Sequence, residues 1–262
     1  MFETRRLRTR IGLQLLLTVL VVPFVFPLYA MVQGSLAGLG WGNYATVLSL
    51  PVLPRFFINS ALISAAVIVI VMFCTMTAAF GFSKLHIRFK EVYFWLLLIC
   101  LTLPGVVLIA PLFATVTKVG AYNTLWAVII PVAALQIPFT TLLARNFVDG
   151  IPSELIEAAR VDGASIVRVF WNVLLPLSRP IMAAVLVLVF INSWNEFLLA
   201  LLFLQTPDQQ TITLVPSFFV GQYNNDQTKV LAAAVLTGLP VVIAYIALQR
   251  FFERGLAAGA LK

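Results

Sequence analysis

The sequence contains few charged residues. Of its 262 residues, 10% are charged and 61% are hydrophobic. A soluble globular domain has roughly a quarter charged and roughly half apolar residues. The apolar residues here also come in runs that are too long for soluble helices. The composition therefore excludes an ordinary soluble domain and predicts an integral membrane protein.

Three further absences exclude particular kinds of functional site in this chain. No Gly-Lys pair occurs in the chain, so the phosphate-binding motif G-x-x-x-x-G-K-[ST] cannot form. Cys74 and Cys100 both fall within apolar runs and have no CxxC spacing, which predicts neither a disulfide framework nor a metal site. His86 has no second His or Cys at ligand spacing. We therefore expect no catalytic residues, no metal and no cofactor in this chain.

Long apolar runs dominate what remains. A helix needs roughly 20 apolar residues to cross about 30 Å of hydrocarbon. Six stretches meet this requirement, at about 11–33, 56–83, 91–116, 124–147, 180–203 and 229–250. Several contain prolines, which are expected to kink the helices. We expect an all-α integral membrane fold with six transmembrane helices in a single domain, residues 1–262.

The positive charges are distributed unevenly across this six-span arrangement. A net charge of +7 would suggest nucleic acid in a soluble protein. Here, all but three of the 17 Lys and Arg fall on the face that carries both termini, and the exceptions are Arg55, Lys118 and Lys229. Positive residues stay in the cytoplasm during insertion. We expect a multi-pass protein in the lipid bilayer with both termini cytoplasmic and no nucleic-acid partner.

The cytoplasmic loop 148–180 has the most distinctive sequence, VDGIPSELIEAARVDGASIVRVFWNVLLPLSRP. Pro152 and Ser153 predict a helix start with Ser153 as a cap, and the helix is expected to run from Glu154 to about Val161. Because Glu154 lies in the first turn, its charge favours that helix.

Asp162-Gly163 is expected to end this helix, because glycine permits a left-handed backbone. Asp162 is then the candidate cap of a second helical stretch over about 164–174, which is expected to end at Leu175-Pro176. The loop is thus predicted to form a helical hairpin.

Small residues mark the exposed corner of this hairpin. Ala158, Ala159 and Gly163 would let another protein approach closely, which favours a docking site. The alternative is an amphipathic hairpin that lies at the membrane interface and merely links two spans.

The same loop resembles the EAA loop of bacterial ABC importer permeases. That pattern is EAA, three residues, G, and a later I/V-x-LP, and it is matched here by Glu157, Ala158, Ala159, Gly163, Val173, Leu175 and Pro176. The resemblance implies a coupling helix that sits in a groove of an ATPase subunit. It implies two such partner subunits, which bind ATP and Mg. The residues implied in ATPase coupling are Glu157, Ala158, Ala159, Asp162, Gly163, Leu175 and Pro176.

Other segments are similar to the maltose-type carbohydrate importers. They are Asn59-Ser60, the run Trp194-Asn195-Glu196-Phe197 and the end QRFFERGLAAGALK. The resemblance implies a type I importer permease fold in the bacterial cytoplasmic (inner) membrane. It also implies a second permease subunit that completes a heterodimer, a substrate route at their interface, and an extracytoplasmic solute-binding protein.

Glu196 is the one acid well inside a predicted span. An ionisable group there marks a functional site by default, because it must face a bundle interior or a water-filled cavity. Asn192, Ser193 and Asn195 surround it in the sequence. These side chains are candidates to meet sugar hydroxyls, and the alternative is a purely structural network between helices.

Three more residues are candidates for the substrate path. Asn59, at the outer end of the second span, could line the path or could serve as a helix cap or packing residue. Gln222 and Tyr223, in the third outer loop, could touch a binding protein or the substrate, or could simply be solvated.

Taken with the missing phosphate-binding motif, these features predict a permease subunit that imports a sugar or related polyhydroxylated solute by alternating access. Glycerol phosphate systems share this permease type and are an alternative. An ion-coupled secondary transporter is a further alternative, for which Glu196 supplies an intramembrane acid but no internal repeat is visible.

Overall fold

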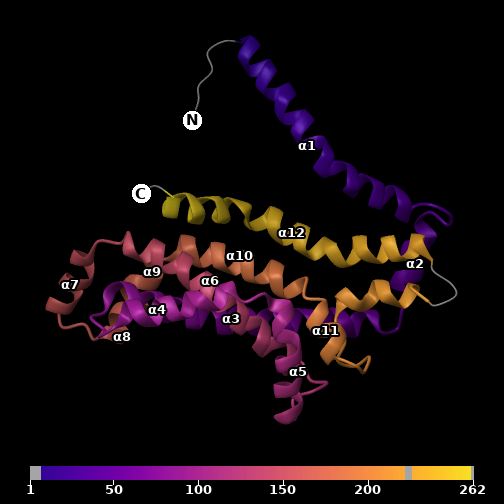
Figure 1. Cartoon of the computed structure of the whole chain (residues 1–262). Coiled ribbons are helices and arrows are strands. Elements are labelled where there is room, and N and C mark those ends of the chain that lie inside the picture. Colours follow the sequence, from indigo (N-terminus) through magenta and orange to yellow (C-terminus); the bar gives the residue numbers. More distant parts are fainter. Residues whose placement is uncertain (1–6, 222–225, 261–262) are drawn as a thin grey trace. The chain divides into compact units, whose positions relative to one another are not determined.

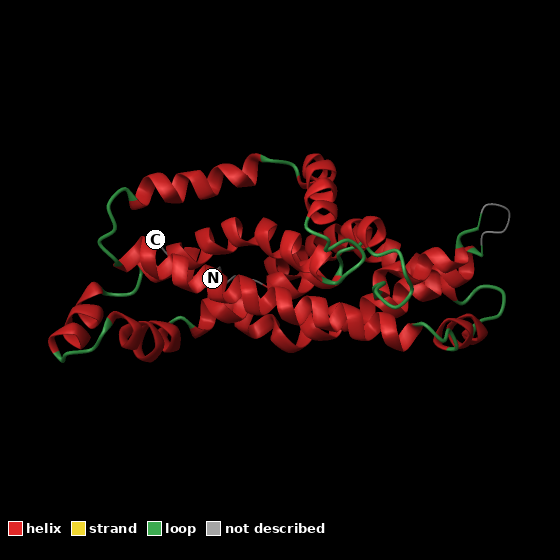
Figure 2. Cartoon of the chain, turned by 90° about the horizontal axis from the view of Figure 1, so that it is seen from below, coloured by secondary structure: helices red, strands yellow, loops and turns green. Residues whose placement is uncertain are grey.

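The computed structural model describes residues 7–221 and 226–260, with side chains for 11–221 and 226–249. These residues form helices joined by short connections, without a strand (Figure 2). The elements are α1 (Leu7–Ser35), α2 (Trp41–Leu48), α3 (Leu53–Lys84), α4 (Lys90–Ile99), η1 (Cys100–Thr102), η2 (Gly105–Leu108), α5 (Ile109–Lys118), α6 (Trp126–Asp149), α7 (Ser153–Val161), α8 (Ile166–Val169), η3 (Phe170–Leu174), α9 (Leu175–Leu177), α10 (Arg179–Trp194), α11 (Leu198–Phe203), η4 (Ile212–Phe219) and α12 (Gln227–Ala260).

Four single helices are long and apolar enough to cross a membrane. They are α1, α3, α6 and α12, and they overlap the predicted spans 11–33, 56–83, 124–147 and 229–250. Two bent helix pairs pass the same test, which raises the number to six if each pair is one span. The all-α membrane fold is therefore confirmed.

The predicted span 91–116 is bent where proline and glycine break it. Its two arms, Lys90–Thr102 and Gly105–Lys118, meet at 92°, and α5 leaves the line of α4 in Figure 1. Leu103 is extended (φ −83°, ψ 117°), because the ring of Pro104 disfavours a helical backbone at the residue before it. The expected kink thus becomes a sharp corner.

The predicted span 180–203 is divided into two helices, unlike the single helix expected there. α10 ends at Trp194 and α11 starts at Leu198, with three non-helical residues between them. A second bend, of 78°, lies just before this region, between Ile166–Leu177 and Arg179–Trp194.

Contacts within the chain group the elements into two compact units. Unit 2 comprises residues 54–214 and 238–262, and small and β-branched side chains fill its core. Val67 and Val71 of α3, Val128 of α6 and Val185 of α10 are all fully buried there. Such residues let helices approach closely in a membrane.

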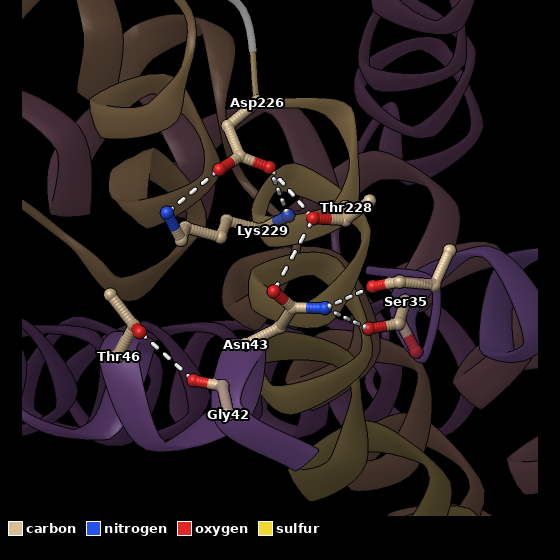
Figure 3. A network of polar contacts seen from close by, with 8 residues as sticks. Ser35, Gly42, Asn43, Thr46, Asp226, Thr228 and Lys229 are labelled. Atoms are coloured by element: carbon tan, nitrogen blue, oxygen red, sulfur yellow. Dashed lines mark hydrogen bonds and ion pairs between the residues drawn. The ribbon is translucent and has the colours of Figure 1, made fainter. Parts of the chain in front are cut away.

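Unit 1 comprises residues 1–53 and 215–237, and a buried amide joins its parts. Asn43 on α2 is 1% exposed. Its Nδ2 donates to the carbonyl oxygens of Ser35 and Ala37, at 2.9 Å and 2.8 Å. Its Oδ1 accepts from Thr228 Oγ1 at 3.3 Å (Figure 3). One side chain therefore ties the end of α1, the start of α2 and the start of α12. The single-domain prediction stays a prediction.

Candidate functional site

The first arm of the predicted hairpin is α7. It starts at Ser153, one residue before the predicted start, with Pro152 in the capping position and no side-chain cap. The prediction that Ser153 caps this helix is therefore wrong, because Ser153 is already the first helical residue. Pro152 (φ −56°, ψ 131°) instead fixes the entry of the chain through its ring.

α7 ends in a Schellman motif, in which two backbone hydrogen bonds close around a left-handed glycine. Gly163 has φ +81°. Its N–H donates to the carbonyl of Arg160 at 3.0 Å, and the N–H of Ala164 reaches back to the carbonyl of Ala159 at 2.9 Å. Only glycine adopts this backbone without strain, so the predicted break at Gly163 is confirmed.

The cap of the second arm is Ser165, which corrects the expectation that Asp162 would serve. Ser165 has an extended backbone, and its Oγ accepts from the N–H of Arg168 at 3.3 Å. Asp162 lies too far upstream because the glycine turn occupies the residues between it and α8. It forms the C-cap of α7 instead.

The second arm does not end at Leu175-Pro176, as was expected. α8, the π-helical η3 and α9 follow one another without a gap. Pro176 lies in the first turn of α9, where its missing N–H removes no bond within that helix. The chain turns only at Ser178, before α10 begins.

The hairpin buries one side and exposes the other. Ile156, Val169, Phe170 and Leu174 belong to the hydrophobic core of unit 2, and Ala159 and Leu175 pack against it while partly exposed. The remaining residues of the predicted coupling set are exposed: Glu157, Ala158, Asp162, Gly163 and Pro176. A Cβ built on Gly163 would meet nothing within 4 Å, so this corner is open to a partner.

A lysine holds the base of the hairpin, a role that the sequence did not reveal. Lys84, at the end of α3, donates from Nζ to the carbonyl of Ile151 at 2.5 Å. In the sequence analysis, Lys84 was only one of the positive charges from which the orientation of the spans was predicted. A lysine at the last turn of a helix is the signal that could have indicated a bond to a nearby carbonyl.

Glu196 lies in the break between α10 and α11. Its Oε1 accepts from the N–H of Leu199 at 2.8 Å, so the carboxylate caps α11 at its N-terminal end, where a negative charge is favoured. Its backbone carbonyl accepts from Thr213 Oγ1 at 2.9 Å. The side chain is half-buried. The capping role explains why a carboxylate stands in this span.

The three neighbours of Glu196 do not join it in one polar cluster. Asn192 is exposed and donates to the carbonyl of Leu188, one turn back in α10. Ser193 is buried and donates to the carbonyl of Val189 at 2.7 Å. Asn195 is exposed at the end of α10. No hydrogen bond between helices involves these three side chains in the described part of the chain.

Asn59 anchors the segment that follows α11. The side chain is 1% exposed, and its Nδ2 donates to the carbonyls of Asp208 and Gln210, at 2.9 Å and 2.8 Å. Arg55, one turn earlier in α3, donates to the same Asp208 carbonyl at 3.0 Å. Asn59 is thus a tertiary clamp, and neither of the two alternatives weighed for it included this role.

Asn123 binds the beginning of the same segment and was not a sequence candidate. It has a left-handed backbone (φ +59°), which asparagine tolerates well. Its Oδ1 accepts from the N–H groups of Gln205 and Thr206, at 2.8 Å and 3.1 Å. Its Nδ2 donates to the Thr206 hydroxyl at 3.1 Å. Two asparagines therefore hold residues 205–210. Gln222 and Tyr223 lie outside the described residues.

The hairpin and Glu196 both fall in a part of the chain that matches a known family. Residues 72–258 match the family described as the binding-protein-dependent transport system inner membrane component. The chain belongs to this family. An inner membrane component of this kind is a non-catalytic permease part of an ABC transporter. Asn59 lies before the matched range.

Some named relatives of this inner membrane component are sugar permeases. It is 34% identical over 207 residues to the arabinooligosaccharides transport system permease protein AraQ of Halalkalibacterium halodurans. This alignment covers 79% of this chain and 74% of AraQ. It is 31% identical over 227 residues to the melibiose/raffinose/stachyose import permease protein MelC of Bacillus subtilis. This alignment covers 86% of this chain and 82% of MelC.

The fold of the inner membrane component also has a solved counterpart. A chain in the crystal structure of a bacterial ABC transporter involved in the import of the acidic polysaccharide alginate superposes with a TM-score of 0.80. The match has 21% sequence identity and covers 96% of this chain and 99% of that chain. This likeness shows that the two chains share a permease fold.

Proposed function

We propose that the chain is the permease subunit of an ATP-driven importer for a sugar or a related polyhydroxylated solute. Family membership supports the transporter class. The names of AraQ and MelC, which cover most of this chain, support the carbohydrate class. Glycerol phosphate remains an alternative solute within the same class.

The exposed corner of the hairpin is the observation that carries the proposal. The Schellman motif closes the turn between α7 and α8 with two backbone hydrogen bonds, and Ile156 and Val169 hold the two arms on the core. Glu157 and Ala158 are exposed beside it and have no side-chain hydrogen bond or ion pair among the described contacts. A surface that is rigid and unoccupied suits docking to another protein. In this proposal it receives an ATPase subunit.

The proposal requires several partners. Two ATPase subunits bind ATP and Mg, and each docks on a permease hairpin. A second permease subunit completes the substrate route, and an extracytoplasmic binding protein delivers the solute. The apolar window of α1 has none of its residues buried, which suits a helix that faces lipid and a partner permease. Both termini are cytoplasmic in this arrangement.

ATP-driven closure of the ATPase subunits moves the hairpins together and opens the permease pair toward the binding protein. Hydrolysis then resets the inward-open state. In unit 2, α7 and α11 lie at opposite ends (Figure 1), so α7 can face the ATPases while α11 lies near the outer face. Such a cycle needs no chemistry in this chain.

Polar side chains near the α10–α11 break are the proposed solute contacts. Asn192 and Asn195 are exposed and Glu196 is half-exposed, so their oxygens and amide groups can meet hydroxyls. Gln222 and Tyr223 stay proposed contacts of the solute or its binding protein. The side-chain amide of Asn59 and the hydroxyl of Ser193 already have backbone partners, which supports a role for these two residues in the wall of the route rather than in direct contact with the solute.

Reconstituted transport tests the function. The chain would be co-expressed with the permease, ATPase and binding-protein subunits encoded beside it and placed in proteoliposomes. Uptake of labelled maltose, raffinose, arabinotriose and glycerol 3-phosphate is then measured with ATP inside. We expect uptake of a neutral sugar that depends on ATP and on the binding protein. Uptake by the chain alone, driven by a proton or sodium gradient without ATP, would contradict the proposal.

Docking at the hairpin has a separate test. Ala158→Trp places a large ring on the exposed face of α7, and we expect the ATPase subunits to be lost during purification. Val119→Trp is the matched control, because Val119 is 69% exposed on a loop far from the hairpin in sequence. Equal ATPase recovery with both variants would exclude the docking role.

A further inference from the structure

An arginine near the end of α6 makes more charged contacts than any other described side chain. Arg145 is 14% exposed, and its Nη2 donates to Glu91 Oε1, at the start of α4, over 2.6 Å. Its Nε lies 3.7 Å from Asp149 Oδ2, one turn later in α6. The Glu91 side chain is 54% exposed, so the pair lies at the surface on the α4 side, and its short, charge-assisted geometry joins the two helices there.

An aromatic ring fixes the same guanidinium in orientation. The Cζ atom of Arg145 lies 4.0 Å from the ring centroid of Phe94, and Phe94 is 7% exposed. Phe94 in turn packs edge-on against Phe82 of α3, with ring centroids 5.4 Å apart. An arginine that is stacked on a ring and paired with a carboxylate has little freedom. Arg145 therefore locks the end of α6 to the start of α4.

The position of this lock matters because the hairpin begins directly after it. α6 ends at Asp149, and the Ile151 carbonyl is held by Lys84 of α3. At its other end, α4 runs into the 92° corner that leads to α5. The base of the hairpin is thus connected to α3 through Lys84 and to α4 through Arg145.

We propose that Arg145 is a positioning residue that transmits movement of the hairpin, through Glu91, to the bent α4–α5 pair. This inference rests on the proposed function, since it concerns how ATP-driven movement enters the membrane. With the pair intact, α4 follows the hairpin. Without it, the end of α6 moves alone, and ATP is hydrolysed without solute crossing.

The test measures solute transported per ATP hydrolysed by the complete complex in proteoliposomes. Arg145→Met keeps the apolar stem and removes the charge, and Glu91→Gln removes the partner charge. We expect each to lower the ratio about tenfold, within the usual range of coupling between two sites, while the ATPase rate is kept. The charge-exchanged double variant Glu91→Arg/Arg145→Glu should recover part of the ratio, because it restores the ion pair but neither the stacking on Phe94 nor the contact with Asp149.

Arg88→Met is the matched control. Arg88 also lies over a ring, with its Cζ 4.9 Å from the centroid of Phe89, but it is exposed and has no carboxylate partner among the described residues. We expect an unchanged ratio. A wild-type ratio in Arg145→Met would overturn the inference. So would a proportional fall of both rates with less assembled complex, because that result signals a merely structural role. Wild-type complex without ATP-dependent uptake would instead refute the proposed function itself.

Discussion

Two non-helical parts of unit 2 are held in different ways. The corner of the hairpin is closed by backbone bonds around Gly163. The segment 205–210 is held by side-chain amides of Asn59 and Asn123, which lie in other parts of the chain. The hairpin corner is thus a local structure with an open surface, whereas the conformation of segment 205–210 depends on tertiary hydrogen bonds to its backbone.

The difference bears on what each region can do. A corner that closes on itself keeps its shape when a partner binds or leaves, and its exposed side chains stay available. A segment clamped by side-chain amides is fixed to the parts of the chain that hold it and moves when they move. We therefore expect mutations to reduce the stability of segment 205–210 more than that of the hairpin corner.

The largest expected effect is at Asn59. Asn59→Ala removes two hydrogen bonds and leaves the Gln210 carbonyl without its donor, while Arg55 still reaches Asp208. We expect a loss of about 2–3 kcal/mol in stability, measured as thermal unfolding of the detergent-solubilised complex. Asn192→Ala is the control, because that exposed amide bonds only within its own helix, and its loss should stay below about 0.5 kcal/mol. Equal losses would remove the distinction between clamp and surface amide.

Asn123 should have the second largest effect. Asn123→Ala removes its bonds to Gln205 and Thr206 and also strains the left-handed backbone. Asn123→Gly removes the same bonds without that strain. We expect about 1–2 kcal/mol of destabilisation from the glycine variant and more from the alanine variant, in the same unfolding measurement. A neutral glycine variant would show that the backbone alone fixes this turn.

Gly163 tests the hairpin side of the comparison. Gly163→Ala forces a Cβ into the left-handed region, which is expected to cost about 1 kcal/mol, although no atom stands in its way. Asparagine is the next best residue at such a cap, so Gly163→Asn should retain more ATPase coupling than Gly163→Val. Coupling is measured as transport per ATP. If asparagine and valine uncouple the complex equally, the constraint at this position is contact with a partner rather than backbone shape.

The smallest effect is expected at Asp226 in unit 1, before α12. The side chain of Lys229, the hydroxyl of Thr228 and the N–H of Lys229 hold the pKa of Asp226 at about 2 (Figure 3). Because this pKa lies below the unfolded value, the stabilisation is complete above about pH 4 and is lost as pH falls toward 2. The melting-temperature difference between wild type and Asp226→Asn should therefore be constant from pH 8 to pH 5 and shrink below pH 4. A difference that changes near neutral pH would contradict this assignment.

The sequence predicted the parts of the structure that depend on local patterns. Apolar run length located α1, α3, α6 and α12, and the glycine after Asp162 correctly predicted the left-handed corner. The two predicted caps were wrong because three oxygen-bearing residues, Ser153, Asp162 and Ser165, lie near the helix starts. If the start of a helix moves by one or two residues, a different one of these side chains is in position to cap it.

The tertiary hydrogen bonds of Asn59 and Asn123 and the ion pair between Arg145 and Glu91 could not be predicted from local patterns. Asn59 bonds to residues 149 and 151 positions away, and Asn123 to residues 82 and 83 positions away. Arg145 and Glu91 are 54 positions apart. A single sequence contains no period or spacing that links such positions, and their pairing follows only from how the helices pack.

The Schellman corner has a consequence for engineering. Its two closing bonds lie within six consecutive residues, from Ala159 to Ala164, and a Cβ built on its glycine would meet no other atom within 4 Å. The segment 153–165 can therefore be exchanged for the equivalent segment of another permease when its core-facing residues Ile156, Ala159 and Ala164 are retained. A chimaera of this kind would carry a new docking specificity on an unchanged membrane body, so that subunits from different transporters could be paired by design.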